Sequence, residues 1–448
     1  MPNRVTENHA DPDIRRSEAL WTRAQGLIPC GTQTLAKGPT QFVDGVAPKY
    51  LRRGRGARVW DVDDNEYLDF SMGVGPLVLG YAHPAVDGAV RAQLDDGITF
   101  SLMHPLEVEV AERVRALVPG AECVRFGKTG AEAMSAAVRL ARAFTGREGV
   151  AACGYHGWHD WCVAVTGRTA GVPATVRALT RTFRFNDLDS AALAIDTTTA
   201  CVVLEPVGFE EPRRDFLHEL RALCDARGAL LVFDEMWTGF RLALGGAQQA
   251  FSVRADLACF SKAVANGMPL SLLTGRADVL RLLERDVFFF STFGGEALSL
   301  AAARATLDAL QAHDVPAHLL RLGRRLRDGY NDAAAALGLE FTRCGGYPCR
   351  TQVVFDDQPQ AGALLLKSLV QQELLRRGIL WGGVHNLSLA HTDSDIEYAL
   401  GAYDAALRVL REALRMGDVA ARLRGAPVEP ALRRQDAERA PIVAGARA

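Results

Sequence analysis

The sequence predicts an α/β protein: a mostly parallel central sheet with helices on both faces, together with a smaller α+β domain. From about residue 105, segments with helical spacing alternate with short, almost entirely apolar runs such as ACVVLEPV, ALLVFDEMW and LACFSK. Such runs suit strands that are buried on both faces, as in a parallel sheet covered by helices. After about residue 300 long helices predominate, which suits the smaller α+β domain.

The expected elements follow in chain order. A proline-free helix runs from Asp13 to Leu27, and two β-prone runs, 57–61 and 66–70, then flank a turn and form a hairpin. Helical spacing predicts later helices at 105–118, 131–146, 299–313, 317–338, 362–377 and 393–415, with a strand at 351–355. The predicted domains are 1–70, a helix and hairpin segment of the small domain; 71–310, the large domain; and 311–416, the C-terminal small domain. Residues 417–448 lack periodicity and are expected to form a mobile tail.

Composition is that of an ordinary globular protein. The 448 residues are 48% hydrophobic and 23% charged, and the net charge is −2. Without an excess of either sign, no nucleic acid or membrane partner is indicated, and small molecules or a second copy of the chain are expected. Nine cysteines without a CxxC pair indicate reduced thiols and no zinc site. The polar start and the lack of a long apolar run favour a cytoplasmic, soluble protein.

The strongest chemical signal is a carboxylate and an amine that follow neighbouring apolar runs. Asp234 ends one run, and Lys262 comes shortly after the next. Both would reach the edge beyond the strand carboxyl ends, where open α/β sheets bind ligands. Pyridoxal 5'-phosphate (PLP) chemistry needs such a pair, because a lysine holds the cofactor as a Schiff base and an acid keeps its pyridine nitrogen protonated. Taken alone, the two residues would more often form a salt bridge or a solvated loop pair.

A glycine-containing turn at residues 127–131 stands between a short strand and a helix. Free amides at such a helix start, around Thr129, Gly130 and Ala131, can hold a phosphate. An ordinary helix start capped by Thr129 would show the same pattern. Tyr155 and His156 lie between two glycines, where an aromatic ring could stack on a flat cofactor, although buried aromatic residues more often belong to the core.

These segments resemble the class III (ω-type) aminotransferases of PLP fold type I, the aspartate aminotransferase-like fold, and within them the branch containing glutamate-1-semialdehyde aminomutase. The resemblance runs from about residue 18 to about residue 405. It rests on an ordered set of motifs: YAHPAV, LEVEVAERV, VRFGKTGAEAMSAAVRLARAFTGR, YHGWHDW, LEPV, LCDARGALLVFDEMWTGFR, FSKAVANGMPL and STFGGEAL. Such a set is specific, and it implies a PLP-dependent aminotransferase whose large domain, 71–310, binds the cofactor.

The resemblance also implies roles for single residues. Lys262 would be the Schiff-base lysine and Asp234 the partner of the pyridine nitrogen. The other cofactor contacts it implies are Thr129, Gly130 and Ala131 at the phosphate, Tyr155 beside His156 on one ring face, Met236 on the other face and Glu205 near the ring oxygen. Thr292 matches a residue that reaches the phosphate of the neighbouring subunit's cofactor, which implies a homodimer with shared sites.

Two segments depart from the family's usual patterns. The phosphate turn is usually Asn-Ser-Gly-Thr-Glu, whereas this chain has Lys128 and Ala131 at the first and fourth places, so Ala131 offers only its amide. The aminomutase carries Pro-Val-Arg before the first hairpin, whose arginine is expected to hold a substrate carboxylate through a two-pronged ion pair. Here Lys37 stands near that place, so the planar fork is missing.

The segments GTQTLAKGPTQF, GVAPKYL and GYHGWHDW look more like the sugar branch of the family, which aminates keto or aldehyde groups on sugars, including aminoglycoside antibiotics. Gln33, Thr34 and Lys37 are therefore substrate candidates, and an ordinary polar loop explains them equally well. His385 and Asn386 stand where the small domain could close over a substrate, although a structural role fits them at least as well.

The expected activity is ping-pong transfer of an amino group from a donor such as glutamate to a sugar aldehyde or ketone. Alternatives within PLP chemistry are the 2,1-aminomutase reaction on glutamate 1-semialdehyde, epimerisation or elimination. The alternative from another class is a non-catalytic relative that binds only cofactor or partners. The variant turn with Lys128 and Ala131 favours that alternative, and the intact Asp234 and Lys262 oppose it.

Overall fold

The computed structural model describes residues 11–430. They fall into two compact units. Unit 1 comprises the described residues up to His83 and those from Ala317 onward, and unit 2 comprises Pro84–Pro316. Among residues 11–430, no helix combines the length and the apolar character needed to cross a membrane.

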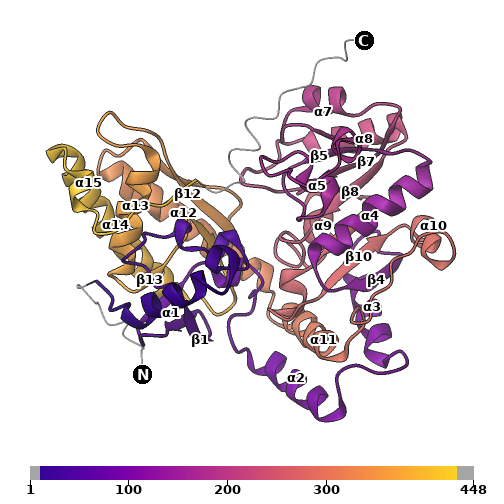
Figure 1. Ribbon diagram of the computed structural model, residues 1–448, viewed down its shortest axis with the longest axis horizontal. Helices are drawn as coiled ribbons and strands as arrows, with labels where there is room; N and C mark the ends of the chain where they lie inside the picture. Colours follow the sequence, from indigo (N-terminus) through magenta and orange to yellow (C-terminus); the bar gives the residue numbers. More distant parts are fainter. Residues whose placement is uncertain (1–10, 431–448) are drawn as a thin grey trace. The chain divides into compact units, whose positions relative to one another are not determined.

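A seven-stranded sheet forms the centre of unit 2 (Figure 1). Its strands are β4 (Cys123–Gly127), β5 (Gly149–Cys153), β6 (Thr180–Thr182), β7 (Thr199–Leu204), β8 (Leu230–Asp234), β9 (Leu257–Phe260) and β10 (Ser271–Gly275). They stand in the order β4, β10, β9, β8, β7, β5, β6, and only β10 runs antiparallel to its neighbours. The prediction of a mostly parallel sheet is confirmed.

Helix α4 (Gly130–Thr145) shows how the sheet is buried. Its apolar side packs against alternate residues of the strands, such as Cys201 and Val203 in β7. Val202, which points to the other face, is equally buried, so helices and loops cover both faces of the sheet. The helix ends at Gly146, whose φ of 67° is left-handed and favours glycine, and this is the end that the sequence predicts.

The remaining helices of unit 2 lie between and after the strands. They are α2 (Pro84–Asp96), α3 (Pro105–Leu117), α5 (Asp160–Val163), α6 (Ala174–Ala178), α7 (Leu188–Ala194), α8 (Phe216–Arg227), α9 (Gly246–Phe251), α10 (Ala277–Leu280) and α11 (Ala297–Ala312). The predicted helices 105–118 and 299–313 correspond to α3 and α11.

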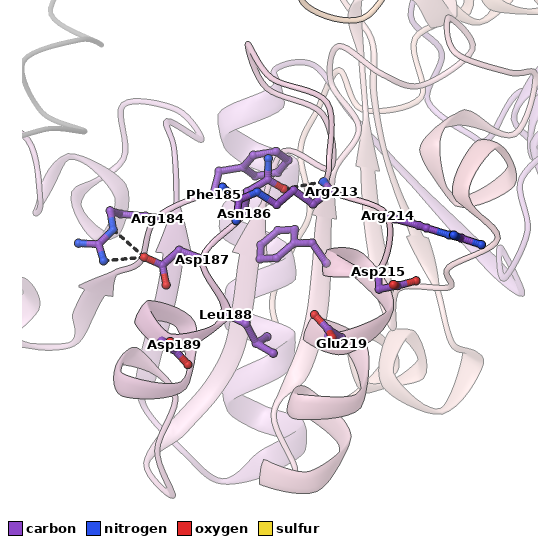
Figure 2. A pocket seen from close by; sticks show the side chains of 11 residues that line it. Arg184, Phe185, Asn186, Asp187, Leu188, Asp189, Arg213, Arg214, Asp215 and Glu219 are labelled. Carbon is purple, nitrogen blue, oxygen red and sulfur yellow. Dashed lines mark hydrogen bonds and ion pairs between the residues drawn. The ribbon is translucent and has the colours of Figure 1, made fainter.

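A cavity of about 650 Å³ opens between the segment after β6 and the start of α8 (Figure 2). Arg184 and Asp187 form an ion pair in its wall, and Asn186 accepts a hydrogen bond from the backbone N–H of Arg213. Its lining mixes both signs of charge with the rings of Phe185 and Phe216 and includes none of the predicted site residues. This cavity is therefore separate from the residues that the sequence singles out.

Unit 1 contains two smaller sheets. One has the order β1 (Leu51–Arg55), β2 (Arg58–Asp61), β3 (Glu66–Asp69), β13 (Ile379–Leu380), and the other has the order β11 (Thr342–Gly345), β12 (Arg350–Phe355), β14 (Val384–Asn386). Its helices are α1 (Arg15–Gln25), α12 (Val315–Ala336), α13 (Ala363–Leu375), α14 (Asp393–Met416) and α15 (Val419–Arg422). The predicted hairpin is confirmed, since β2 pairs antiparallel with β3.

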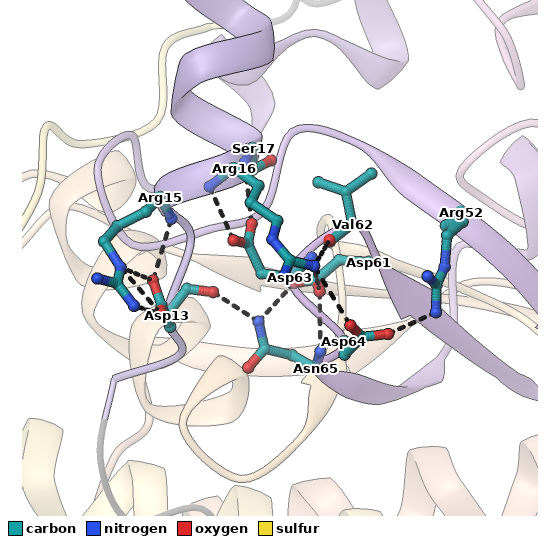
Figure 3. Close-up of polar contacts among 10 residues, drawn as sticks. All are labelled: Asp13, Arg15, Arg16, Ser17, Arg52, Asp61, Val62, Asp63, Asp64 and Asn65. Atoms are coloured by element: carbon teal, nitrogen blue, oxygen red, sulfur yellow. Dashed lines mark hydrogen bonds and ion pairs between the residues drawn. The ribbon is translucent and has the colours of Figure 1, made fainter.

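The hairpin turn also holds the first helix (Figure 3). The carboxylate of Asp63 accepts hydrogen bonds from the backbone N–H of Arg16 at 2.7 Å and of Ser17 at 2.9 Å, which caps α1 from a distant part of the chain. The helix is shorter at both ends than the predicted range. Asp13 accepts from the N–H of Arg15 instead of joining the helix, and Gly26 ends it.

The segment after α14 differs from the expected mobile tail as far as it is described. Residues 419–422 form α15, Asp44 and Ala426 pair as an isolated antiparallel bridge, and the N–H of Val428 donates to Ser368 Oγ at 3.0 Å. Val419 and Val428 are buried, so apolar contacts as well as hydrogen bonds hold this segment on unit 1. The rest of the predicted tail, 431–448, lies outside the described residues.

Candidate active site

Several of the residues singled out in the sequence meet at one edge of the unit 2 sheet. Because β5, β7, β8 and β9 are parallel, their carboxyl ends lie on the same side. Asp234 ends β8 and pairs in register with Cys259 of β9, shortly before Lys262. Glu205 directly follows β7, and Tyr155 and His156 follow β5. The topology therefore brings an amine, two carboxylates and two aromatic rings to the edge where open α/β sheets bind ligands.

Asp234 is 3% exposed and is held by a buried histidine. Its Oδ2 lies 2.8 Å from His156 Nδ1, and its Oδ1 accepts from the N–H of Met236 at 3.0 Å. His156 Nε2 lies 3.0 Å from the carbonyl oxygen of Cys153, which can only accept, so Nε2 carries a proton. His156 thus fixes the position of the Asp234 carboxylate.

Lys262 starts a short 3₁₀ turn, 262–265, with a φ of 48°, in the left-handed region that a lysine rarely adopts. Asn266, which ends the turn, has a φ of 44°. The hydroxyl of Ser261 closes the loop by donating to the carbonyl oxygen of Leu270 at 2.6 Å. Strained backbone of this kind persists where the surroundings hold it, and it is found most often at functional sites.

The predicted phosphate turn forms the start of α4. Thr129 Oγ1 accepts from the N–H of Glu132, whose carboxylate accepts from the N–H groups of Lys128 and Thr129. The next two amides, of Gly130 and Ala131, have no acceptor among the described residues, as is usual for the first turn of a helix. An anion is the natural partner for such amides, because the helix dipole adds to their attraction.

Met236 and Gly157 lie against this turn. A Cβ on Gly130 would lie 2.8 Å from Met236 Sδ, so the turn and Met236 are in contact. A Cβ on Gly157, whose φ is +119°, would lie 2.7 Å from Ala131 Cβ. Only glycine fits at position 157, because any side chain there would collide with the turn and strain the backbone. The loop with Tyr155 and His156 is thereby seated against the start of α4.

The positions of Glu205 and Thr292 are inferred from residues near them. Burial, together with the negative charge of Glu205, raises the pKa of the Cys153 thiol to about 12, which places Glu205 near the end of β5. Thr292 is exposed in the loop before α11, and this loop passes β4, since a Cβ on Gly294 would lie 3.1 Å from the carbonyl oxygen of Phe126.

Comparison with known proteins decides the family. The model of a family described as aminotransferase class-III matches residues 43–388. The chain belongs to the class III aminotransferases. Its fold is accordingly PLP fold type I, and it is an enzyme of the aminotransferase class.

Relatives of this class III aminotransferase carry different names. A 3-aminobutyryl-CoA aminotransferase of Cloacimonas acidaminovorans is 32% identical over 413 residues, covering 90% of this chain and 99% of that protein. A glutamate-1-semialdehyde 2,1-aminomutase of Syntrophobacter fumaroxidans is 36% identical over 423 residues, covering 86% and 96%. The structure of the PLP internal aldimine form of the Sphingopyxis sp. MTA144 FumI protein superimposes with a TM-score of 0.83 at 31% identity, covering 89% of this chain and 97% of that one.

The cofactor of this aminotransferase is PLP. The residues at the sheet edge fit that group. The amides of Gly130 and Ala131, at the start of α4, suit a phosphate. A carboxylate at Asp234 suits a protonated ring nitrogen, and an amine at the neighbouring strand end, on Lys262, suits an aldehyde.

The substrate candidates Gln33, Thr34 and Lys37 lie in unit 1, apart in sequence from the cofactor residues. All three are exposed, on the segment that leads into and through the 3₁₀ turn Leu35–Lys37. The loop is ordered by its own backbone, since the N–H of Lys37 donates to the carbonyl oxygen of Thr34. Their side chains are therefore available to a ligand.

His385 and Asn386 occupy a different environment from the one expected for substrate contacts. His385 is fully buried in β14, with Nδ1 2.8 Å from Thr351 Oγ1 and Nε2 2.7 Å from the hydroxyl of Tyr403. Asn386 Nδ2 donates to the carbonyl oxygen of Ser71 at 3.1 Å. With both ring nitrogens engaged in the core, His385 has a structural role, which leaves neither nitrogen for a substrate.

Sequence reasoning missed contacts that support the site. Ser135 Oγ lies 2.6 Å from His159 Nδ1 and accepts from Trp161 Nε1 at 2.9 Å, which ties the YHGWHDW segment to α4. Lys128 forms an ion pair with Glu296 at the start of α11. The aromatic and histidine repetition in YHGWHDW was a signal for the first contact, whereas nothing in the sequence indicates the second.

Proposed function

We propose that this protein is a ping-pong aminotransferase in which Lys262 holds PLP covalently and Asp234 binds its ring nitrogen. The observation that carries the proposal is the position of these two residues at the carboxyl ends of adjacent parallel strands, β8 and β9. Two further observations support the proposal: His156 holds the Asp234 carboxylate, and the amides of Gly130 and Ala131 start α4, where a phosphate can bind.

The placement of the other lysines supports the choice of Lys262. Lys128 lies in the phosphate turn and pairs with a glutamate. Lys49 is in unit 1 within ion pairs to two carboxylates, and Lys367 donates to a backbone carbonyl. Lys37 is on an exposed loop of unit 1. Lys128 also follows a strand of the unit 2 sheet, but its ammonium is engaged by Glu296, whereas Lys262 follows β9, the neighbour of the strand that ends in the buried Asp234.

The chain's own residues then account for the proton movements. Bound PLP supplies an electron sink that makes the proton next to the substrate nitrogen removable. Once the substrate amine has replaced it, Lys262 Nζ is the base that takes this proton and later returns it. Asp234, held in place by His156, would present its carboxylate to the ring nitrogen throughout. The second half-reaction reverses these steps on the acceptor, which gives ping-pong kinetics.

For the acceptor, we propose an aldehyde or ketone of a sugar, including an aminoglycoside, with glutamate as the amino donor. Lys37 in place of the aminomutase arginine lacks the planar fork that holds a carboxylate, and Gln33 and Thr34 beside it are exposed hydrogen-bonding groups. Such amide and hydroxyl groups can hydrogen-bond to the hydroxyl groups of a sugar acceptor.

A screen of keto and aldehyde sugars, aminoglycoside amines and glutamate 1-semialdehyde, read by mass, tests this assignment. We expect a mass change of one amino group on a sugar and release of 2-oxoglutarate from glutamate. Conversion of glutamate 1-semialdehyde alone would refute the sugar acceptor. Lys262→Ala should turn over none of the substrates in the screen, and turnover of any of them would refute the role of Lys262.

An aminomutase is the second candidate, favoured by the name of the relative at 36% identity. The two reactions differ in whether a keto acid is released. A transfer between two molecules releases a keto acid from the donor, whereas an internal transfer of the amino group releases none. Measuring keto acid during turnover of glutamate 1-semialdehyde therefore separates them.

We also propose a homodimer whose sites lie at the subunit interface. Large apolar side chains are exposed on two segments of unit 2: Leu102 and Met103 are 79% and 82% exposed, and Phe288 and Phe293 are 72% and 57% exposed. The two segments belong to one region, because the N–H of Ala297 donates to the carbonyl oxygen of Ile98. Exposed apolar groups in such number mark a protein interface, and Thr292 lies among them.

Mixing inactive variants tests the shared site. If Thr292 serves the partner's cofactor, a Lys262→Ala subunit paired with a Thr292→Val subunit forms one intact site, so that co-refolded mixtures regain activity. If each subunit uses its own Thr292, no mixture exceeds the activity of the Thr292→Val protein alone. Sedimentation of the unmixed protein should show a dimer, and a monomer would refute the proposal.

A further inference from the structure

Lys128 departs from the usual phosphate turn, and its side chain has a defined place. Its Nζ lies 2.7 Å from Glu296 Oε1 and 3.2 Å from Ser299 Oγ. The side chains of Lys128 and Glu296 are 16% and 10% exposed, so water screens this ion pair only weakly. Removing one member of such a pair is costly, because the other keeps a poorly solvated charge.

Glu296 and Ser299 are themselves fixed. Glu296 caps α11 by accepting from the N–H groups of Leu298 at 2.8 Å and Ser299 at 3.0 Å. Ser299 Oγ contacts Glu296 and donates to the carbonyl oxygen of Pro269 at 3.1 Å, in the loop that follows Lys262. The ammonium of Lys128 thus connects the phosphate turn to the hydrogen-bonded start of α11.

The ammonium of Lys128 also offsets negative charge near the phosphate turn. Glu132 already places a carboxylate on the amides of Lys128 and Thr129, and Glu296 brings another nearby. Burial raises the pKa of Glu296, but the bonds from Lys128 and Ser299 outweigh burial and hold it below its usual value, so Glu296 is ionised. Without a cation, two carboxylates would repel a phosphate bound at Gly130 and Ala131.

We propose that Lys128 is a positioning residue for the cofactor phosphate: it fastens the phosphate turn to the start of α11 and neutralises Glu296, so that the turn accepts a doubly charged anion. This inference rests on the proposed placement of PLP at the sheet edge. It gives the unusual lysine of the turn a role in binding without contact to the reacting atoms.

Binding of PLP and of pyridoxal, which lacks the phosphate, to the full-length apoprotein tests the proposal. Lys128→Met should weaken PLP binding by about tenfold to a hundredfold while changing pyridoxal binding less than about threefold, because Glu296 and Ser299 keep their contacts to α11 and Pro269. Lys128→Arg, which keeps the charge, should bind PLP within about threefold of the parent. Lys49→Met, which removes a shielded, ion-paired lysine of unit 1, is the matched control and should leave both affinities unchanged.

The double variant Lys128→Met/Glu296→Gln separates charge from general damage. It removes the carboxylate along with the cation, so it should bind PLP more tightly than Lys128→Met alone. Three results would overturn the proposal: unchanged PLP binding by Lys128→Met, equal loss of PLP and pyridoxal binding, or an equal loss in Lys49→Met. A parent protein that binds no PLP would instead refute the proposed function, so the two failures are distinguishable.

Discussion

The buried histidines of unit 1 predict a steep loss of stability in mild acid. His385 and His391 are fully buried, and burial lowers the pKa of His385 to about 3 and that of His391 to about 4. In the unfolded chain both would titrate near 6.5. Because the folded pKa values are depressed, the unfolded state binds more protons below pH 6.5. The contribution of the two neutral histidines to the free energy of unfolding is therefore fully present above pH 6.5 and is lost as pH falls toward 4.

The size of the effect follows from linkage. Near pH 5 each histidine contributes a slope of about 1.4 kcal/mol per pH unit to the free energy of unfolding, and about 2 kcal/mol of stability is lost per histidine between pH 7 and pH 5. The perturbation is His385→Gln, which removes one titrating group but keeps a polar side chain between Thr351 and Tyr403. Because the carboxylates titrate equally in both proteins, the difference between them isolates this histidine.

Urea unfolding of the apoprotein, followed by circular dichroism at several pH values from 5 to 7, is the assay. His385→Gln is expected to be less stable than the parent at pH 7, where two core hydrogen bonds are altered, and to lose stability about 1.4 kcal/mol per pH unit more slowly near pH 5. Parallel curves for the two proteins, or a parent whose stability is constant from pH 7 to pH 5, would refute the reasoning.

Two further predictions concern unit 2. Burial raises the pKa of Glu235 to about 7. The contribution of its protonated form to the free energy of unfolding is fully present below pH 4.5 and is lost as pH rises through 7, which costs about 3 kcal/mol by pH 8. Glu235→Gln should flatten that part of the pH dependence in urea unfolding. An unchanged slope in the variant would contradict the assignment. Gly157→Ala should weaken PLP binding about tenfold to a hundredfold in equilibrium dialysis, because its methyl group would meet Ala131 at a φ of +119°, whereas Gly171→Ala, in open space at a similar left-handed φ, should not.

Much of the fold could be predicted from local pattern. The runs that became β7, β8 and β9 are apolar at every position because both faces of the sheet are covered, and the helices after residue 297 show clear helical spacing. The antiparallel β10 and the two-residue β13 could not be found this way. β10 reads like its parallel neighbours, and β13 is a strand only through its pairing with β3.

The site divides in the same way. Asp234 and Lys262 could be predicted because each follows its own strand, and parallel strands bring their ends together. His156 was also expected at the site, but its contact with Asp234, 78 positions away, was not predicted. The ion pair between Lys128 and Glu296, 168 positions apart, was not predicted either. His385 had two interpretations in the sequence, a substrate contact or a structural role, and its burial in β14 beside Tyr403 supports the structural one.

Covalent mapping of the cofactor tests the central claim most directly. Reduction of the PLP-loaded protein with borohydride fixes the cofactor on its lysine, and the chain's few lysines lie far enough apart in sequence for peptide mass spectrometry to tell them apart. The account predicts the added mass on Lys262 alone, and its absence from every peptide of Lys262→Ala. Labelling of another lysine in the parent, or no labelling at all, would contradict it.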